Sequence, residues 1–163
     1  EDTFDPKISA LAMKSDFIAS VCLVKDKEED RPLDGFLQER PIFRHVVALL
    51  EQLHADAAAA LTIGRAEGKL AHLFSVGVDP QYGGKGLCTR LVKLCMEKAR
   101  QHGFSGMLAE CSSAFSAASL KKLGGEEVAS IEYRDWVSPV DGSKPFAAMK
   151  PPHSHLKMLL VRL

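Results

Sequence analysis

The sequence predicts a mixed α/β domain built on one main sheet. Apolar runs rich in β-branched residues, typical of strands, are interleaved with runs in which apolar residues recur at helical spacing. The chain has 163 residues, of which 46% are hydrophobic and 26% charged, and this is enough for one substantial core. Because the predicted strands outnumber the helices, one sheet flanked by helices is the simplest arrangement, and residues 1–163 are expected to form a single domain.

The first predicted elements are a strand, a charged loop and a helix. Residues 15–26 (SDFIASVCLVKD) form an apolar run typical of a strand, and residues 25–35 (KDKEEDRPLDG) are a charged loop. Residues 41–61 predict a helix with Pro41 near its start. The apolar residues that follow its helical period are Phe43, Val46, Val47, Leu50 and Leu53.

The remaining elements alternate to the end of the chain. Residues 69–78 (KLAHLFSVGV) predict a buried strand, after which a glycine turn leads into a second helix. One face of that helix is expected to pack on the sheet, at roughly 1.5–3 kcal/mol for each buried leucine. That face carries Leu87, Leu91, Leu94, Cys95 and Ala99. There follow a strand at 103–111, a short helix at 113–125 ended by Gly124 and Gly125, a strand at 126–136, a loop rich in Pro and Gly, and a last strand at 155–163.

Charge and composition exclude several classes of function. Lys plus Arg and Asp plus Glu number 21 each, so no overall charge favours nucleic acid or an anionic membrane as a partner. No apolar run reaches the ~20 residues of a bilayer span, no secretory signal is visible, and a cytoplasmic location is expected. The cysteines lack zinc-site spacing and are expected to be reduced thiols; they are Cys22, Cys88, Cys95 and Cys111. The chain begins with Glu1 rather than Met, so its start is expected to lie upstream.

The glycine turn is the first candidate site. Gly83, Gly84 and Gly86 stand where the first helical turn leaves backbone N–H groups unpaired, and glycine lets a ligand approach that backbone. An anion is favoured at such an end by about 0.3–2 kcal/mol per charge, which predicts a phosphate-bearing ligand. The alternative is that the glycines only make a tight connection from strand to helix.

Two common phosphate motifs do not match this turn. A P-loop needs Gly-Lys followed by Ser or Thr, whereas Lys85 is followed by Gly86. A dinucleotide-binding Gly-x-Gly-x-x-Gly would begin at Gly84, but Thr89 or Arg90 stands where its third glycine belongs. Another kind of anion site is therefore expected.

The segment VDPQYGGKGLC, between a strand and a helix, resembles motif A of the GNAT acetyltransferase superfamily, whose members bind acetyl-coenzyme A. In that alignment Gly83 falls at the family's Arg or Gln position, Gly86 at its central glycine and Cys88 at its last small residue. Two of these three positions depart from the pattern. The resemblance puts the Cys88 thiol at a helix N-terminus, where we expect it to be acidified.

A second segment, AECSSAFSAASLKKLGG, is similar to the arylalkylamine (dopamine-type) N-acetyltransferases of this superfamily, and EYRDW and PPHSHLKMLLVRL are similar to their last strands. The resemblance covers about residue 70 to 163, while residues 15–60 match only loosely. It implies a GNAT fold: one twisted, mixed, mostly antiparallel sheet flanked by helices, with a splayed cleft between two central parallel strands. The family's first strand and two helices need more residues than precede Ser15, so part of that region is expected to be missing.

The resemblance also implies an activity and its cosubstrate. The expected reaction is acetyl-CoA-dependent N-acetylation of a small primary amine, arylalkylamine-like, by direct transfer in a ternary complex without a metal. The turn amides would hold the pyrophosphate and the strand before them the pantetheine arm. The residues so assigned are Val76, Val78, Gly83, Gly84, Lys85, Gly86, Leu87 and Cys88. We expect a monomer or a homodimer that binds neither nucleic acid nor membrane.

Such a reaction needs a base, because an alkyl amine with a pKa near ~10.4 is mostly protonated at pH 7, a deficit of about 4 kcal/mol. Strand alternation predicts that His72, Phe74 and Val76 share one face and Leu73 and Ser75 the other. By resemblance, His72 stands where many relatives carry a catalytic glutamate or histidine, and it is the candidate base. The alternative is a histidine packed in the core. The dopamine-type base in an N-terminal segment has only a faint match in EDTFDPKI and is not assigned.

A donor should also meet the departing thiolate. The tyrosine that many superfamily members use is replaced here by Leu120, whereas the dopamine-type enzymes present two serines, matched by Ser112 and Ser116. We expect these hydroxyls to share one helical face and to hydrogen-bond the substrate or thiolate. The alternative is that Ser112 or Ser113 caps the helix.

Other polar and aromatic residues are weaker candidates. His153 and His155 have spacing like that of metal ligands but no third ligand, so they are expected near the substrate cleft, and Tyr133 and Trp136 are expected to pack.

Two rival functions stay open. A protein or peptide acetyltransferase would need an open acidic groove beside His72, and a non-catalytic CoA-binding domain would suit Leu120, Gly83 and the unassigned glutamate.

Overall fold

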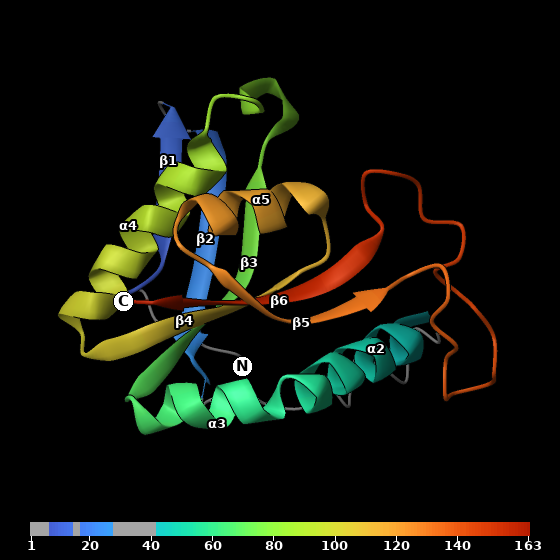
Figure 1. The fold of residues 1–163 in the computed structure, drawn as a ribbon. Coiled ribbons are helices and arrows are strands. Elements are labelled where there is room, and N and C mark those ends of the chain that lie inside the picture. The colour runs from blue at the N-terminus through green and yellow to red at the C-terminus, as the bar shows by residue number, and fades with distance from the viewer. Residues whose placement is uncertain (1–6, 15–16, 28–41) are drawn as a thin grey trace.

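The computed structural model describes residues 7–14, 17–27 and 42–163, which form one mixed sheet with strand order β1-β2-β3-β4-β6-β5 (Figure 1). The strands are β1 Ala10–Lys14, β2 Phe17–Asp26, β3 Lys69–Val78, β4 Phe104–Cys111, β5 Glu126–Glu132 and β6 His155–Arg162. Every described pair is antiparallel except β3 with β4, which is parallel. The mixed, mostly antiparallel sheet with a central parallel pair is confirmed.

Helices cover both faces of the sheet (Figure 1). They are α2 Ile42–Asp56, α3 Ala58–Ala66, α4 Leu87–Gln101 and α5 Ala114–Lys122, and a 3₁₀ turn, η2 Pro80–Tyr82, precedes α4. One core, under α4 and α5, includes Leu91 and Met107; the other, under α2 and α3, includes Leu53 and Leu108. The neighbours Met107 and Leu108 thus point to opposite cores, which explains why the central strand β4 is apolar almost throughout.

The buried face of α4 is rotated from the predicted one, and Leu87 is only half-buried. Leu91, Cys95 and Ala99 are buried as expected, but Leu94 is 44% exposed. Val92 and Met96 are buried in its place, because residues one and five positions after Leu91 lie closer to the sheet-facing line of this helix than the residue three positions after it.

The predicted helix at 41–61 is two helices. α2 and α3 meet at Ala57 with an angle of 63° between them, and Ala57 is itself 1% exposed in the core. The bend lets both helices follow the twisted sheet. Among the described residues, no single helix is long and apolar enough to cross a membrane, although α2 and α3 taken together reach that length and hydropathy.

Several other element boundaries differ from the predicted ones. The strand at 69–78 has the predicted bounds, although it is buried only from Leu70 to Leu73. β1 was not anticipated, and Lys25 and Asp26 belong to β2 rather than to the charged loop. Residues 28–35 of that loop lie outside the described residues. The strand predicted at 126–136 ends at Glu132, because the chain then turns so that Trp136 is buried with its indole N–H donated to Gln52 Oε1 (2.8 Å).

The parallel strands β3 and β4 separate part-way along their length. Their pairing ends at His72 opposite Leu108, although β3 runs on to Val78. Between the separated ends lies a hollow of about 210 Å³, the smaller cavity, whose lining includes Val76 and Cys111. The expected splayed cleft is therefore present.

A β-bulge changes which residues of β3 share a face. Opposite β2, the pairing steps from Leu23–Ser75 to Val24–Leu73, so Phe74 is the extra residue. Val76 consequently packs with the α4 core that also contains Leu73. The prediction that Val76 shares the face of His72 and Phe74 was wrong, because simple alternation does not survive an inserted residue.

Candidate active site

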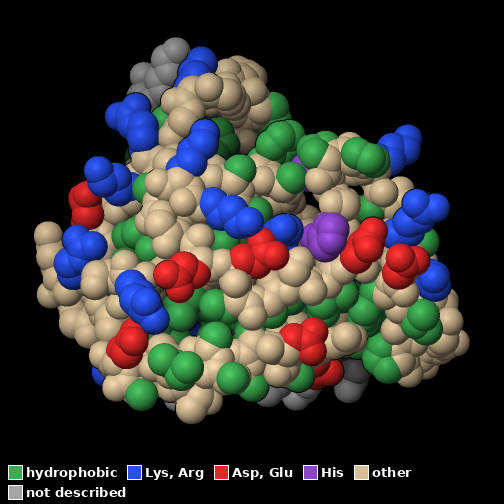
Figure 2. All heavy atoms as spheres, in the orientation of Figure 1, with side chains coloured by type: hydrophobic (Ala, Val, Ile, Leu, Met, Phe, Trp, Pro, Cys, Tyr) green, Lys and Arg blue, Asp and Glu red, His purple; other side chains and the backbone are tan. Residues whose placement is uncertain are grey.

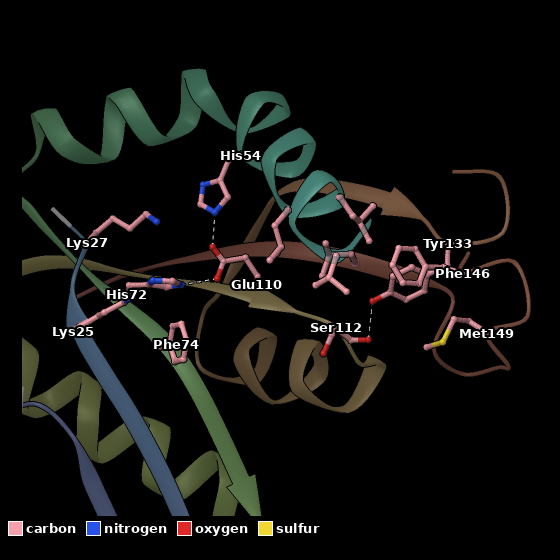
Figure 3. Close-up of a pocket in the computed structure, with 14 residues that line it drawn as sticks. Lys25, Lys27, His54, His72, Phe74, Glu110, Ser112, Tyr133, Phe146 and Met149 are labelled. Atoms are coloured by element: carbon pink, nitrogen blue, oxygen red, sulfur yellow. Dashed lines mark hydrogen bonds and ion pairs between the residues drawn. The ribbon is translucent and has the colours of Figure 1, made fainter. Parts of the chain in front are cut away.

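A cavity of about 590 Å³, the larger cavity, lies between α2 and the sheet (Figure 3). Three of its walls come from elements that are distant in sequence: α2, β6 and the loop after β5. The apolar residues that these elements supply are Val46, Leu49, Leu50, Phe146, Met149 and Leu156. A site of this size with mainly apolar walls suits a small organic molecule.

The polar end of the larger cavity holds a carboxylate between two imidazoles. His54 Nε2, from α2, lies 2.7 Å from Glu110 Oε1, and His72 Nε2, from β3, lies 2.6 Å from Glu110 Oε2. Figure 3 shows the two rings directed at the carboxylate from two different sides. Glu110 itself stands on β4, with its side chain 12% exposed.

The charge state of Glu110 follows from these contacts. Burial raises the pKa of Glu110, but hydrogen bonds and charge from His54 and His72 outweigh it, so the pKa lies well below its ordinary value of 4.5. An ionised carboxylate only accepts hydrogen bonds. Each Nε2 therefore carries the hydrogen that it donates to Glu110, and in a neutral ring the acceptor nitrogen is Nδ1.

The two cavities meet at three residues. Phe74, Glu110 and Ser112 line both the larger and the smaller cavity. A molecule in the cleft between β3 and β4 and a second molecule under α2 would therefore approach each other beside the Glu110 carboxylate. This is the geometry that a transfer between two substrates requires.

The glycine turn ends at the start of α4 with an open backbone. Gly84 and Gly86 have φ of 71° and 72°, and nothing lies within 4 Å of a Cβ built on either. Gly86 is the N-cap of α4 and no side-chain hydrogen bond caps that end, so the first N–H groups of the helix are exposed to a ligand. Gly83 has an ordinary φ of −59°, and its place next to Pro80 follows from the η2 turn.

Positive side chains surround this turn. Figure 2 shows Lys and Arg side chains over α4 and the segment that precedes it, and the exposed ones nearest the turn in sequence are Lys85, Arg90 and Lys93. Exposed amides, positive charge and room for a close approach fit the diphosphate of a coenzyme A molecule.

Cys88 does not behave as predicted at this helix end. Burial raises the pKa of the Cys88 thiol above its ordinary value, and a hydrogen bond with Ser119 opposes this only in part. The expectation of an acidified thiol was wrong, because the side chain turns into the smaller cavity rather than toward the exposed end of the helix.

The two predicted serines occupy different environments. Ser112 precedes α5, is exposed and stands where the cavities meet, and its carbonyl accepts a hydrogen bond from Tyr133 Oη (2.9 Å). Ser116 lies within α5 and donates its hydroxyl to the carbonyl of Ser113 (2.9 Å). Both line the smaller cavity, but Ser112 is not helical, so they do not share a helical face. Ser113 is the cap, accepting from the Ser116 N–H (3.1 Å).

The remaining predicted residues have structural contacts. His153 Nδ1 accepts from the N–H of Ala114 (3.2 Å), and His155 Nδ1 is 2.7 Å from Ser154 Oγ. Neither histidine lines the two cavities described above. Leu120 is buried as a packing residue, as Tyr133 also is. The described residues contain no group of three or more His, Cys, Asp or Glu that could hold a metal.

Sequence reasoning missed His54 and Glu110. Glu110 had one usable signal, a carboxylate next to the end of an otherwise apolar strand, where an ionisable side chain is rarely buried without a partner. His54 had a weaker one, since it follows Leu50 by four positions and so shares the apolar face of α2.

Comparison with known proteins finds clear relatives. A family model described as the acetyltransferase (GNAT) family matches residues 14–124. An agmatine N-acetyltransferase structure superposes with a TM-score of 0.76 at 20% identity, covering 96% of this chain and 74% of that chain. A Drosophila melanogaster polyamine N-acetyltransferase that forms N-acetylagmatine gives 0.72 at 21% identity, with 96% and 75% covered. Arylalkylamine N-acetyltransferase 2 from Aedes aegypti gives 0.75 at 24% identity, with 95% and 73% covered.

Proposed function

Because the chain belongs to the acetyltransferase (GNAT) family, we propose that it transfers the acetyl group of acetyl-coenzyme A to a small primary amine with an apolar, arylalkylamine-like body. The observation that carries this proposal is the junction of the two cavities at Phe74, Glu110 and Ser112. One cavity lies between the splayed strands and the other under α2, so each substrate would have its own cavity, and Glu110 lines both.

The splayed strands and the glycine turn would bind the coenzyme. The amides of Gly84 to Cys88 begin α4 and would hold the diphosphate. Beyond His72, β3 is not paired with β4, so its backbone there, including Val76 and Val78, would bond the pantetheine arm as an added strand. When bound, acetyl-CoA supplies an activated thioester carbonyl.

The larger cavity favours an apolar acceptor over a polyamine. Its described lining contains a single carboxylate, Glu110, which is already bonded by two histidines, and it also contains Lys25 and Lys27. A second ammonium group would have to be buried among aliphatic and aromatic side chains, at a cost of several kcal/mol if unpaired. The same lining is not the open acidic groove that a protein substrate would need.

The reaction requires a base for the amine proton and a hydrogen-bond donor for the departing thiolate at the junction of the cavities. The amine nitrogen forms a bond to the thioester carbonyl carbon, the carbon–sulfur bond breaks, and the amine proton passes to a base. An imidazole on Glu110 is the base, His72 being the one that the sequence predicted. The Ser112 hydroxyl, exposed at the junction, would donate a hydrogen bond to the departing thiolate, with Ser116 deeper in the same cleft.

The test is a turnover assay with tryptamine, agmatine and a lysine-containing peptide, against a reaction without acceptor. Free CoA and acetylated product are both measured by mass spectrometry. We expect tryptamine to have the highest kcat/KM, because its indole is the acceptor body that suits the apolar cavity. Binding of CoA without product from any amine would favour a non-catalytic CoA-binding domain, and preference for the peptide would favour a protein substrate.

A further inference from the structure

His54 has one ring nitrogen bonded and the other open. Its Nε2 bonds Glu110 Oε1 at 2.7 Å, and no other hydrogen bond or ion pair joins this ring to the described residues. Among those residues no side-chain nitrogen or oxygen is both fully buried and without a partner. The Nδ1 atom of His54 is therefore in contact with open space.

His54 stands between the acceptor cavity and a second hollow. It lines the larger cavity and also a hollow of about 260 Å³ beside α2, the outer hollow, which it shares with Lys27 and Glu51. Its side chain is 30% exposed, against 9% for His72. The His54 ring is therefore more accessible to water than the His72 ring, which lines the larger cavity but not the outer hollow.

His72 is held more firmly. Its Nε2 is 2.6 Å from Glu110 Oε2, and its ring meets the Phe74 ring edge to face, with centroids 6.0 Å apart. The His72 ring therefore holds Oε2 of Glu110, the carboxylate oxygen that His54 does not contact. The His72 ring is well placed to orient the carboxylate and is less exposed to solvent than the His54 ring.

We propose that His54 takes the proton of the acceptor amine on Nδ1, and that Glu110 and His72 are positioning residues that orient His54 and stabilise its imidazolium. In this step the amine N–H bond breaks, an Nδ1–H bond forms, and the positive charge appears beside the Glu110 carboxylate. The proton then leaves to water through the outer hollow. The inference rests on the proposed N-acetyltransferase function.

Charged and titratable groups line both hollows around His54. Among the described residues they are Lys25, Lys27, Glu51, His54, His72, Glu110 and Tyr133. Tyr133 donates its hydroxyl to the Ser112 carbonyl, and burial raises the pKa of Tyr133 to about 12. A general base of the proposed kind gives the pH profile of kcat/KM an acidic limb, and that limb should be lost with the base.

The test compares His54→Gln with His72→Gln in the pH profile of kcat/KM. We expect His54→Gln to lower kcat by about 10²–10⁴-fold, as for loss of a general base, and to remove the acidic limb. His72→Gln can still donate from its amide to Glu110, so it should lose less than about tenfold and keep the limb. An acidic limb that survives in His54→Gln, or that disappears in His72→Gln, would overturn the assignment.

A matched control lies on the same helix. His45 is bonded to Ser138 Oγ at 2.7 Å and does not line the larger cavity. His45→Gln removes a histidine and a hydrogen bond from α2. Because His45 lies outside the larger cavity, kcat should stay within about twofold of wild type. Thermal unfolding of all three variants separates a local change from loss of the fold.

Two further measurements test the assignment independently of the pH profile. Added imidazole should restore activity to His54→Ala, because the vacated space opens to the outer hollow, but not to His72→Ala. Nitrogen chemical shifts should show His54 as the Nε2–H tautomer in the free protein, and an Nδ1–H tautomer would refute the inference. A wild-type protein that acetylates no amine would instead refute the proposed function, so the two failures are distinguishable.

Discussion

Substitution of Gly86 by alanine would test whether the glycine turn binds the coenzyme. Gly86 has a φ of 72°, and a Cβ built there meets nothing within 4 Å. The cost to the fold is therefore conformational, about 1–2 kcal/mol for an L-residue in the left-handed region. For a protein of this length we expect the midpoint of thermal unfolding to fall by about 2–8 °C.

The same methyl group would stand among the amides proposed to hold the diphosphate. We expect Gly86→Ala to weaken CoA binding by about tenfold or more, or roughly 1.4 kcal/mol, from a displaced phosphate and altered N–H directions. Calorimetric titration with CoA measures this affinity, and urea unfolding with an unchanged m-value confirms that the fold is kept.

Gly124→Ala is the matched control. Gly124 has a φ of 89° and also has nothing within 4 Å of its built Cβ, but it follows the C-terminal end of α5, whereas Gly86 is the N-cap of α4. It should therefore lose a similar free energy of unfolding and keep its affinity for CoA. Equal CoA affinity in Gly86→Ala and Gly124→Ala would show that the turn does not hold the coenzyme.

Three further predictions concern residues in and around the site. Leu53 stands on α2 and is fully buried in the core, so Leu53→Ala should lower the free energy of unfolding in urea by about 2–5 kcal/mol. Ser113→Ala removes the α5 cap that accepts from the Ser116 N–H and should cost about 0.5–2 kcal/mol, whereas an equal loss in Ser112→Ala would contradict that assignment of the cap. Because burial raises the pKa of Tyr133 to about 12, ultraviolet titration should show a phenolate step near that pH, and Tyr133→Phe should remove it.

Local patterns were sufficient for most of the secondary structure. The strand at 69–78 was correct in its bounds because an apolar run ends there at an Asp-Pro pair. The turn before α4 was correct because only glycine readily adopts the positive φ found at Gly84 and Gly86. The break between α2 and α3 was missed, since an alanine-rich stretch around Ala57 is compatible with one long helix and the bend follows from packing on the sheet.

The candidate site was predicted only in part. His72 was selected because it stands on β3 at a position where relatives carry a base, and its role stays a proposal. The bulge at Phe74 was invisible in the sequence, because it depends on how β2 pairs with β3. The partner of His72 was missed for the same kind of reason, since Glu110 stands on a neighbouring strand.

The amino-acid sequence by itself determined the order of strands and helices and the open turn before α4, because periodicity and glycine conformation act over a few neighbouring residues. Only the tertiary structure decided that His54 and Glu110, 56 residues apart, share a hydrogen bond, and that two cavities meet beside them. These features bring together a helix and strands that are distant in sequence, so they depend on how α2 packs on the sheet and on the separation of β3 from β4 after His72.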